Sequence, residues 1–459
     1  MQVKTEEDFY NFLKKEKIEY LNLLFPDVLG LLRNVEIPVE EIDDKLKNGA
    51  SVDGSSIEGF ARIEESDLIL NPIPTTIRKY KLDSDNTGIL FCTIERPNGK
   101  RFDGDSLWIL EKQIEKAKEM GFDNFYTGPE LEFFLLENHA HEINNLSNLT
   151  EKLTDSGYYF SIGMDNDKHR PIRRSIMNHC KKMNIPVEYS HHEVAPLQHE
   201  IDLKYTDAFE MALRSMLYRL IVRDVANMNG LYATFMPKPF QNRNGNGMHV
   251  HQSLTKDGKN VFYDPRDKYK LSDIAKMYIA GILNHGCEIA AITNQWVNSY
   301  QRLVPGYEAP TALCWGTRNR SLAVRVPQFK TPKAARIEVR FPDPACNIPL
   351  TFALMLACGL KGIEQEYELP NPVEENIYNL NEEEITKRGI TSLPQNLKEA
   401  TEIMKKSKLV KDVLGKHIYQ SIIANRKKQW EDYIYNVTGK DIENHLVTQY
   451  ELEQLLPIL

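Results

Sequence analysis

The chain has 459 residues, of which 41% are hydrophobic and 27% are charged, and its formal net charge is −8. This length supports two or more domains and a large core, and the negative charge argues against a general nucleic-acid-binding surface. No run approaches the roughly 18 apolar residues that a membrane span requires, and the charged start MQVKTEEDFYNFLKKEK differs from a signal peptide. We therefore expect a cytoplasmic protein with neither a nucleic-acid nor a membrane partner.

Turn-forming residues divide the chain into two expected domains. Residues 1–105 combine a charged helix over residues 5–17 with short strands and the loop SVDGSSIEG, which is typical of a small α+β unit. The stretch ERPNGKRFDGDS collects Pro, Gly and Asp and predicts a boundary. Residues 106–459 interleave strands and helices, with a mainly helical tail from residues 270–286 onwards. We predict an α+β protein without internal repeats.

Three β-prone segments carry polar residues two positions apart. They are GPELEFFLL with Glu130 and Glu132, NGMHVHQSL with His249 and His251, and ARIEVRF with Glu338 and Arg340. Because side chains alternate between the two faces of a strand, each pair projects to one face of a sheet. Burying unpaired charge costs several kcal/mol, so these groups must meet ligands, metals or one another. The three pairs together predict the floor of an active site.

Five glutamates and one histidine form a candidate metal-binding set. Glu193 and Glu200 in HHEVAPLQHE, on either side of Pro196, complete the set of Glu130, Glu132, Glu193, Glu200, His249 and Glu338. Oxygen-rich ligands suit Mg²⁺ or Mn²⁺, whereas zinc prefers nitrogen and sulfur. A single glutamate of this kind is usually a solvated surface charge, but the set contains enough ligands for two ions. His251 alone stays open, since it could bind metal, contact substrate or lie on an exposed strand face.

A basic segment follows the acidic motifs. Its members are Arg302, Arg318, Arg320, Arg325, Lys333, Arg336 and Arg340. Guanidinium groups bind carboxylates and phosphates bidentately, so metals opposite arginines indicate a pocket for a phosphorylated, carboxylated substrate and for phosphoryl transfer. A surface salt-bridge face is the alternative. The chain contains neither GxxxxGK[ST] nor GxGxxG before a helix, so another architecture must hold any nucleotide.

Seven motifs, in this order and at this spacing, resemble type I glutamine synthetase. They are DGSSIEGF, GPELEF, HHEVAPLQHE, NGNGMHVHQSL, RLVPGYEAP, RNRS and RIEVRFPDP. The resemblance covers nearly the whole chain, is closest to the shorter α branch of the family and extends to archaeal relatives. It implies ATP-driven ligation of ammonium to L-glutamate through a γ-glutamyl phosphate. It also implies a β-grasp-like amino-terminal domain, a larger catalytic domain with a curved antiparallel sheet flanked by helices, and a homododecamer of two hexameric rings with sites between subunits.

The resemblance implies roles for individual residues, with two or three Mg²⁺ or Mn²⁺ ions per subunit and ATP as co-substrate. The metal ion near glutamate and ammonium would be held by Glu132, Glu193 and Glu200, and the ion near the ATP phosphates by Glu130, His249 and Glu338. The substrate carboxylate would meet Asn244, Gly245 and Arg302, while Arg320 and Arg340 would stabilise the transferring phosphoryl group and the γ-carboxylate. Nucleotide contacts would come from Glu188, His251, Ser253, Arg320, Arg325 and Lys333.

Two loops carry the remaining catalytic expectations. Ammonium must lose a proton before its nitrogen attacks, and Asp53 in the DGSS loop matches the carboxylate that would accept it in the adjacent subunit's site. The local alternative for Asp53 is an Asx turn. Glu308 in PGYEAP matches a flap residue that shields the acyl phosphate from water and takes the last proton.

The sequence offers a few candidate regulatory residues. Arg62 follows the DGSS loop as in the α branch, where that arginine is linked to feedback by glutamine. Arg173 and Arg174 in RPIRR could bind 2-oxoglutarate or form an ionic face. Tyr378 lies near the position of an adenylylated tyrosine, but the insertion of the adenylylated branch is missing, so we do not expect this modification. A PII-type regulator is a further candidate partner.

Other functions stay open at this point. A relative could join glutamate to another amine, a silent assembly of this fold could act in binding alone, and HxH could support a manganese or iron oxygenase. The intact DGSS loop favours ammonium. The complete metal set, with Asp53 and Glu308, opposes a silent assembly, and the arginines oppose an oxygenase.

Overall fold

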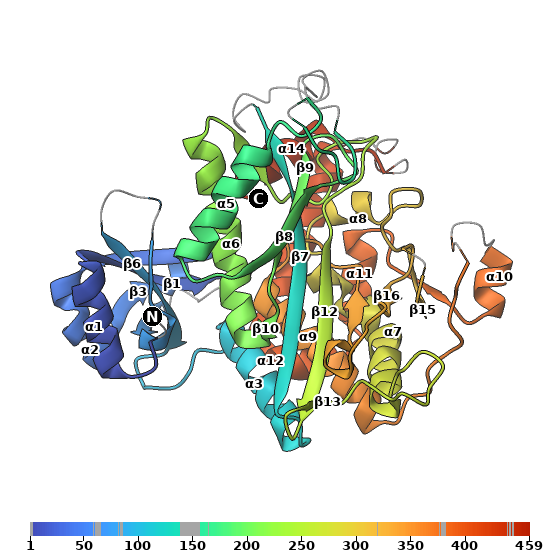
Figure 1. Ribbon diagram of the computed structural model, residues 1–459, viewed down its shortest axis with the longest axis horizontal. Helices are drawn as coiled ribbons and strands as arrows, with labels where there is room; N and C mark the ends of the chain where they lie inside the picture. The colour runs from blue at the N-terminus through green and yellow to red at the C-terminus, as the bar shows by residue number, and fades with distance from the viewer. Residues whose placement is uncertain are drawn as a thin grey trace.

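Two β-sheets divide the chain into a small amino-terminal unit and a larger carboxy-terminal unit (Figure 1). This computed structural model describes residues 3–57, 59, 66–80, 82, 86–137, 157–163, 165–318, 320–375, 377, 382–437, 439, 442 and 445–459. Within that part of the chain, no helix is both long and apolar enough to cross a membrane.

The amino-terminal sheet has the strand order β2-β1-β6-β4-β3, with β5 beside β6. The strands are β1 (Tyr20–Pro26), β2 (Leu32–Pro38), β3 (Ala50–Asp53), β4 (Asp67–Pro72), β5 (Arg78–Lys79) and β6 (Thr87–Glu95). Helices α1 (Glu6–Glu16) and α2 (Ile42–Asn48) belong to the same unit. The predicted first helix is confirmed, since Thr5 and Asp8 form a capping box at its start and Lys17 ends it in a left-handed conformation.

The carboxy-terminal sheet has the order β15-β16-β17-β12-β7-β9-β8, with β10 and β11 beside β7 and β13 beside β12. Its strands are β7 (Asn124–Leu136), β8 (Val187–His192), β9 (Gln198–Leu203), β10 (Thr206–Asp207), β11 (Tyr232–Thr234), β12 (Met248–Lys256), β13 (Lys259–Asn260), β15 (Trp315–Gly316), β16 (Val324–Arg325) and β17 (Ile337–Val339). All pairs are antiparallel except β15 with β16. A separate short pair joins β14 (Ala312–Leu313) to β18 (Thr391–Ser392).

The larger unit contains α3 (Ser106–Glu119), α5 (Arg170–Lys182), α6 (Ala208–Met228), α7 (Asp273–Thr293), α8 (Ser299–Arg302), α9 (Ile348–Glu364), α10 (Glu382–Lys387), α11 (Leu397–Met404), α12 (Lys408–Asn436) and α14 (Gln449–Leu455). Helices α3, α5 and α6 lie directly on strands of its sheet, and α9 packs against α3, α6 and α7. Helix α7 opens the mainly helical tail that the sequence predicts and runs to Thr293. Its close packing on α9 requires glycine, because a Cβ on Gly281 would lie 2.1 Å from the Cys358 carbonyl oxygen.

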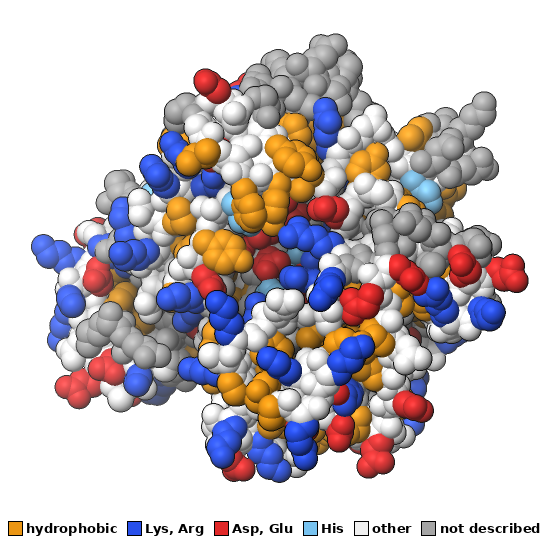
Figure 2. Space-filling model, turned by 45° about the vertical axis from the view of Figure 1, so that its right-hand side comes forward, with side chains coloured by type: hydrophobic (Ala, Val, Ile, Leu, Met, Phe, Trp, Pro, Cys, Tyr) orange, Lys and Arg blue, Asp and Glu red, His pale blue; other side chains and the backbone are white. Residues whose placement is uncertain are grey.

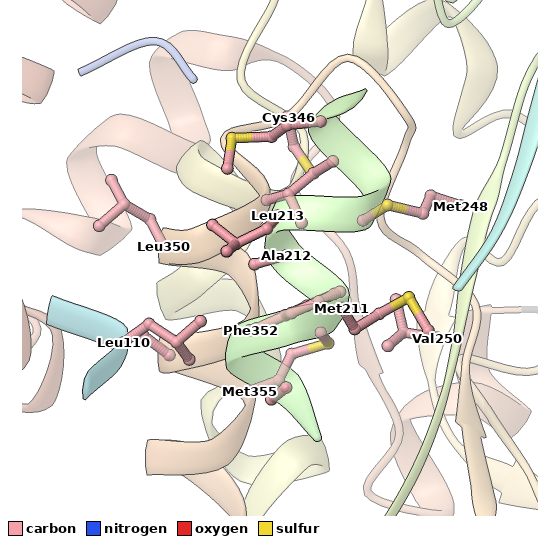
Figure 3. Close-up of a cluster of buried hydrophobic side chains, with 14 of the residues drawn as sticks. Leu110, Met211, Ala212, Leu213, Met248, Val250, Cys346, Leu350, Phe352 and Met355 are labelled. Carbon is pink, nitrogen blue, oxygen red and sulfur yellow. The ribbon is translucent and has the colours of Figure 1, made fainter. Parts of the chain in front are cut away.

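The core explains which face of β12 is left for function. Met248 and Val250 point toward Met211 of α6 and the apolar side chains of α9 (Figure 3), and both are fully buried. Because a strand alternates its side chains, His249 and His251 face the other side of the sheet. The helices therefore bury one half of the strand, and the polar half lines the opposite face.

Buried polar contacts join the two units. Arg219 of α6 donates to the carbonyl oxygen of Gly30 at 2.8 Å, and Arg78 of β5 pairs with Glu210 of α6 at 2.6 Å. Asn347 donates to the carbonyl of Val28 at 3.0 Å. These contacts fix the small unit against the helical face of the larger one.

Candidate active site

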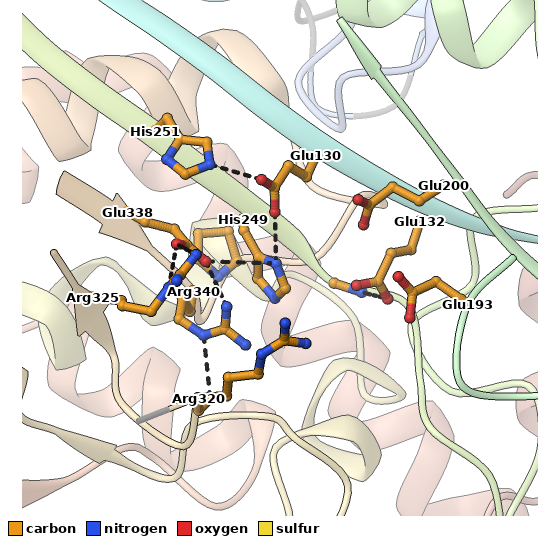
Figure 4. A network of polar contacts seen from close by, with 12 residues as sticks. Glu130, Glu132, Glu193, Glu200, His249, His251, Arg320, Arg325, Glu338 and Arg340 are labelled. Atoms are coloured by element: carbon orange, nitrogen blue, oxygen red, sulfur yellow. Dashed lines mark hydrogen bonds and ion pairs between the residues drawn. The ribbon is translucent and has the colours of Figure 1, made fainter. Parts of the chain in front are cut away.

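The register of four neighbouring strands brings the predicted polar pairs onto one face. His249 lies opposite Glu130, His251 lies opposite Glu338, and Glu132 lies opposite Glu200. Residues between the members of each pair, such as Leu131, are fully buried in the core. The expectation that period-two spacing marks one shared polar face is confirmed (Figure 4).

The first cluster consists of Glu130, His249 and Glu338, whose ligand atoms all lie within 4.8 Å of one another. His249 Nδ1 lies 3.1 Å from Glu130 Oε2, and His251 Nε2 lies 2.7 Å from Glu130 Oε1. Burial opposes ionisation of Glu130, but the two histidines outweigh it and hold the pKa of this carboxyl well below its usual range. Burial and Arg340 lower the pKa of His249 to about 4, so its imidazole is neutral and free to act as a ligand at neutral pH.

Two arginines form ion pairs with Glu338 of the first cluster. Arg325 Nε donates to Glu338 Oε2 at 2.6 Å, and Arg340 donates to the other oxygen of the same carboxylate. Burial of Glu338 opposes its charge, yet Arg340 and His251 lower its pKa to about 2. Glu338 is therefore ionised and held in one orientation.

The second cluster consists of His191, Glu193 and Glu200, again with ligand atoms within 4.8 Å of one another. His191 Nε2 lies 3.1 Å from Glu200 Oε1, and its Nδ1 lies 3.3 Å from Glu193 Oε1. Glu132 lies beside them and accepts hydrogen bonds from the Gly247 amide at 2.8 Å and from Gln198 at 3.0 Å. His191 is not among the predicted ligands, although it stands two positions before Glu193 and shows the same period-two signal.

The second cluster and the adjacent Glu132 place three carboxyl groups side by side in a buried environment, which opposes their ionisation. Burial raises the pKa of Glu132 to about 7, although the Gly247 amide, Arg302 and Arg340 oppose this shift. Burial and neighbouring carboxylates raise the pKa values of Glu193 and Glu200 well above their usual range. A bound divalent cation would neutralise this charge and favour ionised ligands. The residues present therefore fit a hard, oxygen-preferring metal ion.

A cavity of about 320 Å³ lies between the clusters and the arginines. It is lined by both clusters and by the predicted substrate residues Asn244, Gly245, Arg302, Glu308, Arg320 and Arg340. Arg302 is buried, and its guanidinium donates to the backbone carbonyls of Arg340 and Phe341 at 3.2 and 2.9 Å. The NGNG loop lies directly on it, since a Cβ on Gly247 would approach Arg302 Nη2 to 2.6 Å. That loop is part of the site and is not a plain connection.

A second cavity of about 400 Å³ opens on the other side of Glu130. It is lined by Glu188, His251, Ser253 and Lys333, which are four of the six residues predicted to contact nucleotide. The other two, Arg320 and Arg325, line the first cavity. Glu130 lines both cavities, so a phosphate chain that enters from the second cavity would end at the first cluster.

Asp53 lies apart from both cavities of its own chain. It is exposed at the end of β3, where its carboxylate accepts hydrogen bonds from the hydroxyls of Ser55 and Ser56 at 2.6 and 2.7 Å. These hydrogen bonds lower the pKa of Asp53. The local Asx-type turn is therefore present, and the ionised carboxylate lines neither cavity of its own chain.

The geometry argues against the predicted effector role of Arg173. This side chain is buried, donates twice to Asp167 at 2.6 and 2.7 Å, and contacts His199 Nδ1 at 2.9 Å. Its guanidinium therefore serves an internal ion pair, whereas the neighbouring Arg174 is exposed. Arg62 and Tyr378 lie outside the residues that the structure describes.

The fold and the site fit a class of protein, the metal-dependent enzymes: two acidic clusters that could hold cations face arginines of the kind that bind carboxylate and phosphate groups. Family models described as "Glutamine synthetase, catalytic domain" and "Glutamine synthetase, beta-Grasp domain" match residues 104–445 and 17–97. The chain belongs to the glutamine synthetase family. The predicted β-grasp unit, larger catalytic unit and family resemblance are confirmed.

Individual relatives match over nearly their whole length. The chain is 41% identical to a glutamine synthetase of Thermotoga maritima, over 96% of this chain and 99% of the relative. It is 43% identical to one of Methanosarcina mazei, over 94% and 95%. The cryo-EM structure of Plasmodium falciparum glutamine synthetase superposes with a TM-score of 0.85 at 27% identity, covering 96% and 99%. A GmaS–ADP complex superposes with a TM-score of 0.84 at 26% identity, covering 97% and 99%.

Proposed function

We propose that this chain joins ammonium to L-glutamate at the expense of ATP and releases L-glutamine, ADP and phosphate. It is a glutamate–ammonia ligase, the activity that gives its curated relatives their name. The observation that supports this most strongly is a single cavity in which two buried acidic clusters face Arg302, Arg320 and Arg340. Such a cavity suits a dicarboxylate whose side-chain carboxylate receives a phosphoryl group.

The two clusters are the proposed sites of two divalent cations, Mg²⁺ or Mn²⁺. Glu130, His249 and Glu338 would hold one, and Glu132, Glu193 and Glu200, together with His191, would hold the other. When bound, these ions neutralise phosphate and carboxylate oxygens during transfer. The family resemblance implies two or three ions per subunit. Because the described residues form two such clusters, we propose two ions.

The side chains around the first cavity would bind glutamate and then assist transfer of a phosphoryl group from ATP to it. Arg302 is fixed by backbone carbonyls and, with Asn244 and Gly245, would hold the substrate's α-carboxylate. A γ-carboxylate oxygen attacks the terminal phosphorus of ATP and ADP leaves, while Arg320 and Arg340 stabilise the transferring charge.

Ammonia then attacks the acyl carbon and phosphate leaves. Before that attack, ammonium must give a proton to a carboxylate, the role we propose for Asp53 from an adjacent subunit. Glu308 would cover the acyl phosphate and take the last proton.

The second cavity is the proposed nucleotide site. Glu188, His251, Ser253 and Lys333 would contact ATP there, with its terminal phosphate directed toward Glu130. The GmaS relative of the same fold was solved with ADP, which supports nucleotide binding by this architecture.

Assembly would complete the site. Figure 2 shows a hollow in which acidic and basic side chains gather, with hydrophobic side chains close to it on the same face. Phe160 and Tyr189, which line the first cavity, are 62% and 50% exposed. An exposed apolar rim of this kind suits a subunit contact. We therefore propose the homododecamer with sites between subunits, a cytoplasmic location, and a PII-type protein as a candidate regulator.

Amine choice tests the proposed reaction against the closest alternative, a ligase for another amine. With glutamate, ATP and Mg²⁺ present, we expect ammonium to support phosphate release at least roughly tenfold better, in kcat/KM, than methylamine, ethanolamine or putrescine. Phosphate release and the γ-glutamyl product are measured together. A preference for any of the amines would reject ammonium as the substrate.

The two clusters should bind metal with different pH dependence. Ionised ligands are already present in the first cluster, whereas a cation must displace protons from Glu132, Glu193 and Glu200. The affinity of the second cluster for Mn²⁺ should therefore fall about tenfold or more from pH 8 to pH 6, and that of the first cluster much less. Calorimetric titration of Glu338→Gln isolates the second cluster, and titration of Glu200→Gln isolates the first. Equal pH slopes in the two variants would contradict this assignment.

A further inference from the structure

One buried lysine connects two loops of the first cavity. Lys238 is 1% exposed, and its ammonium group donates to the backbone carbonyl of Arg243. The same nitrogen lies 3.7 Å from the centre of the Tyr307 ring. Arg243 directly precedes Asn244 and Gly245, and Tyr307 directly precedes Glu308.

The backbone of Lys238 is itself fixed. Its amide donates to Asn298 Oδ1 at 2.7 Å, and Asn298 Nδ2 returns a hydrogen bond to the Lys238 carbonyl at 3.0 Å. Asn298 also donates to Glu451 of α14 at 3.0 Å. The backbone of Lys238 is therefore fixed by contacts outside the two loops that its side chain contacts.

The loop that carries Tyr307, residues 303–310, is exposed at its tip. Pro305, Gly306 and Glu308 are exposed, and Gly306 and Glu308 adopt left-handed backbone conformations with φ of 93° and 58°. Left-handed backbone is unfavourable for a glutamate and persists where surrounding contacts hold it. The Lys238 amino group over the face of Tyr307 is such a contact when it carries a proton. Burial and the charge of Arg302 lower the pKa of Lys238 to about 7, so the cation is fully present below neutral pH.

We propose that Lys238 is a positioning residue that holds residues 303–310 over the cavity through the Tyr307 ring and thereby limits hydrolysis of the acyl phosphate. This inference rests on the proposed function. When the loop opens, water attacks the acyl carbon, phosphate leaves and glutamate is regenerated, so that ATP is consumed without glutamine. Lys238 lines neither of the two cavities and acts through Tyr307 and Glu308.

The test is the ratio of phosphate released to glutamine formed, with glutamate and ammonium saturating. In the parent this ratio should be close to one. Lys238→Met keeps the aliphatic volume and removes the cation, and Tyr307→Leu removes the ring. Each should raise the ratio by roughly 2- to 10-fold. Tyr307→Phe keeps the ring and should leave the ratio at the parent value.

The double variant Lys238→Met/Tyr307→Leu shows whether the two residues act together. Both single variants remove the same contact between Lys238 and Tyr307. The double variant should therefore release no more phosphate per glutamine than the single variant with the higher ratio. A lower kcat at an unchanged ratio, or additive effects in the double variant, would overturn the inference in favour of a merely structural lysine. If Lys238→Met does not fold, the inference is decided by comparing the ratio of phosphate to glutamine in Tyr307→Leu with that in Tyr307→Phe. A parent that releases no ADP would instead reject the proposed function.

Discussion

Glu338→Gln is expected to lower kcat by roughly 10²- to 10³-fold. The change removes a negative charge that belongs to the first metal cluster and that also pairs with two arginines. Glu338 is fully buried, and its two oxygens receive Arg325 and Arg340 while lying in the cluster with Glu130 and His249. A neutral amide of the same shape keeps the packing but leaves the guanidinium groups without their counter-charge. Rates of ADP release and the number of Mn²⁺ ions bound per subunit measure the effect.

Glu364→Gln is the matched control for this variant. Glu364 lies at the exposed end of α9 and pairs with Lys361 at 2.7 Å. Exposed ion pairs of this kind contribute little to stability, so we expect parental activity and metal binding. Full activity of Glu338→Gln, with two ions still bound, would remove Glu338 from the metal site.

The second large effect is expected from mixing two inactive variants. Asp53→Asn should abolish ammonium-dependent turnover, because an amide cannot accept the proton that ammonium must lose. If Asp53 serves the adjacent subunit's site, a site in a mixed assembly can receive an intact Asp53 from one subunit and an intact Glu338 from its neighbour. Co-expression of Asp53→Asn with Glu338→Gln should then restore about a quarter of the parental activity at equal, random mixing.

Separate purification provides the control for mixing. The two variants, each purified alone and combined without subunit exchange, should stay inactive. Mixed assemblies that remain inactive, while retaining the parental size, would show that Asp53 does not act across a subunit boundary.

Local sequence pattern was sufficient for the strands that form the site floor. Alternation assigns Met248 and Val250 to the core and His249 and His251 to the opposite face, and no knowledge of neighbouring strands is required. The same reasoning located Glu130 with Glu132 and Glu338 with Arg340. The start of the first predicted helix was equally local, since Thr5 caps α1 at the predicted position.

Contacts between distant segments could not be predicted in this way. His191 meets Glu200 because β8 and β9 pair in one particular register. The contact of Lys238 with Tyr307 joins segments about 70 residues apart in the chain. Neither position carries a local signal that names its partner.

The run RPIRR shows the same limit. As a sequence, Arg173 and Arg174 are equivalent basic residues. On α5 they point in different directions, so that Arg173 is buried against Asp167 while Arg174 is exposed. The predicted anion site needed both side chains on one accessible surface, and helix geometry separates them.

The central claim is that the two acidic clusters and the facing arginines drive ATP-dependent ligation of ammonium to glutamate. The most direct measurement follows ADP and glutamine together in one reaction, with glutamate, ammonium, ATP and Mg²⁺, and then omits each component in turn. We predict one glutamine for each ADP, with both products lost when glutamate, ammonium or the divalent cation is omitted. ADP release that proceeds without glutamate, or glutamate-dependent ADP release that never yields glutamine, would contradict this account.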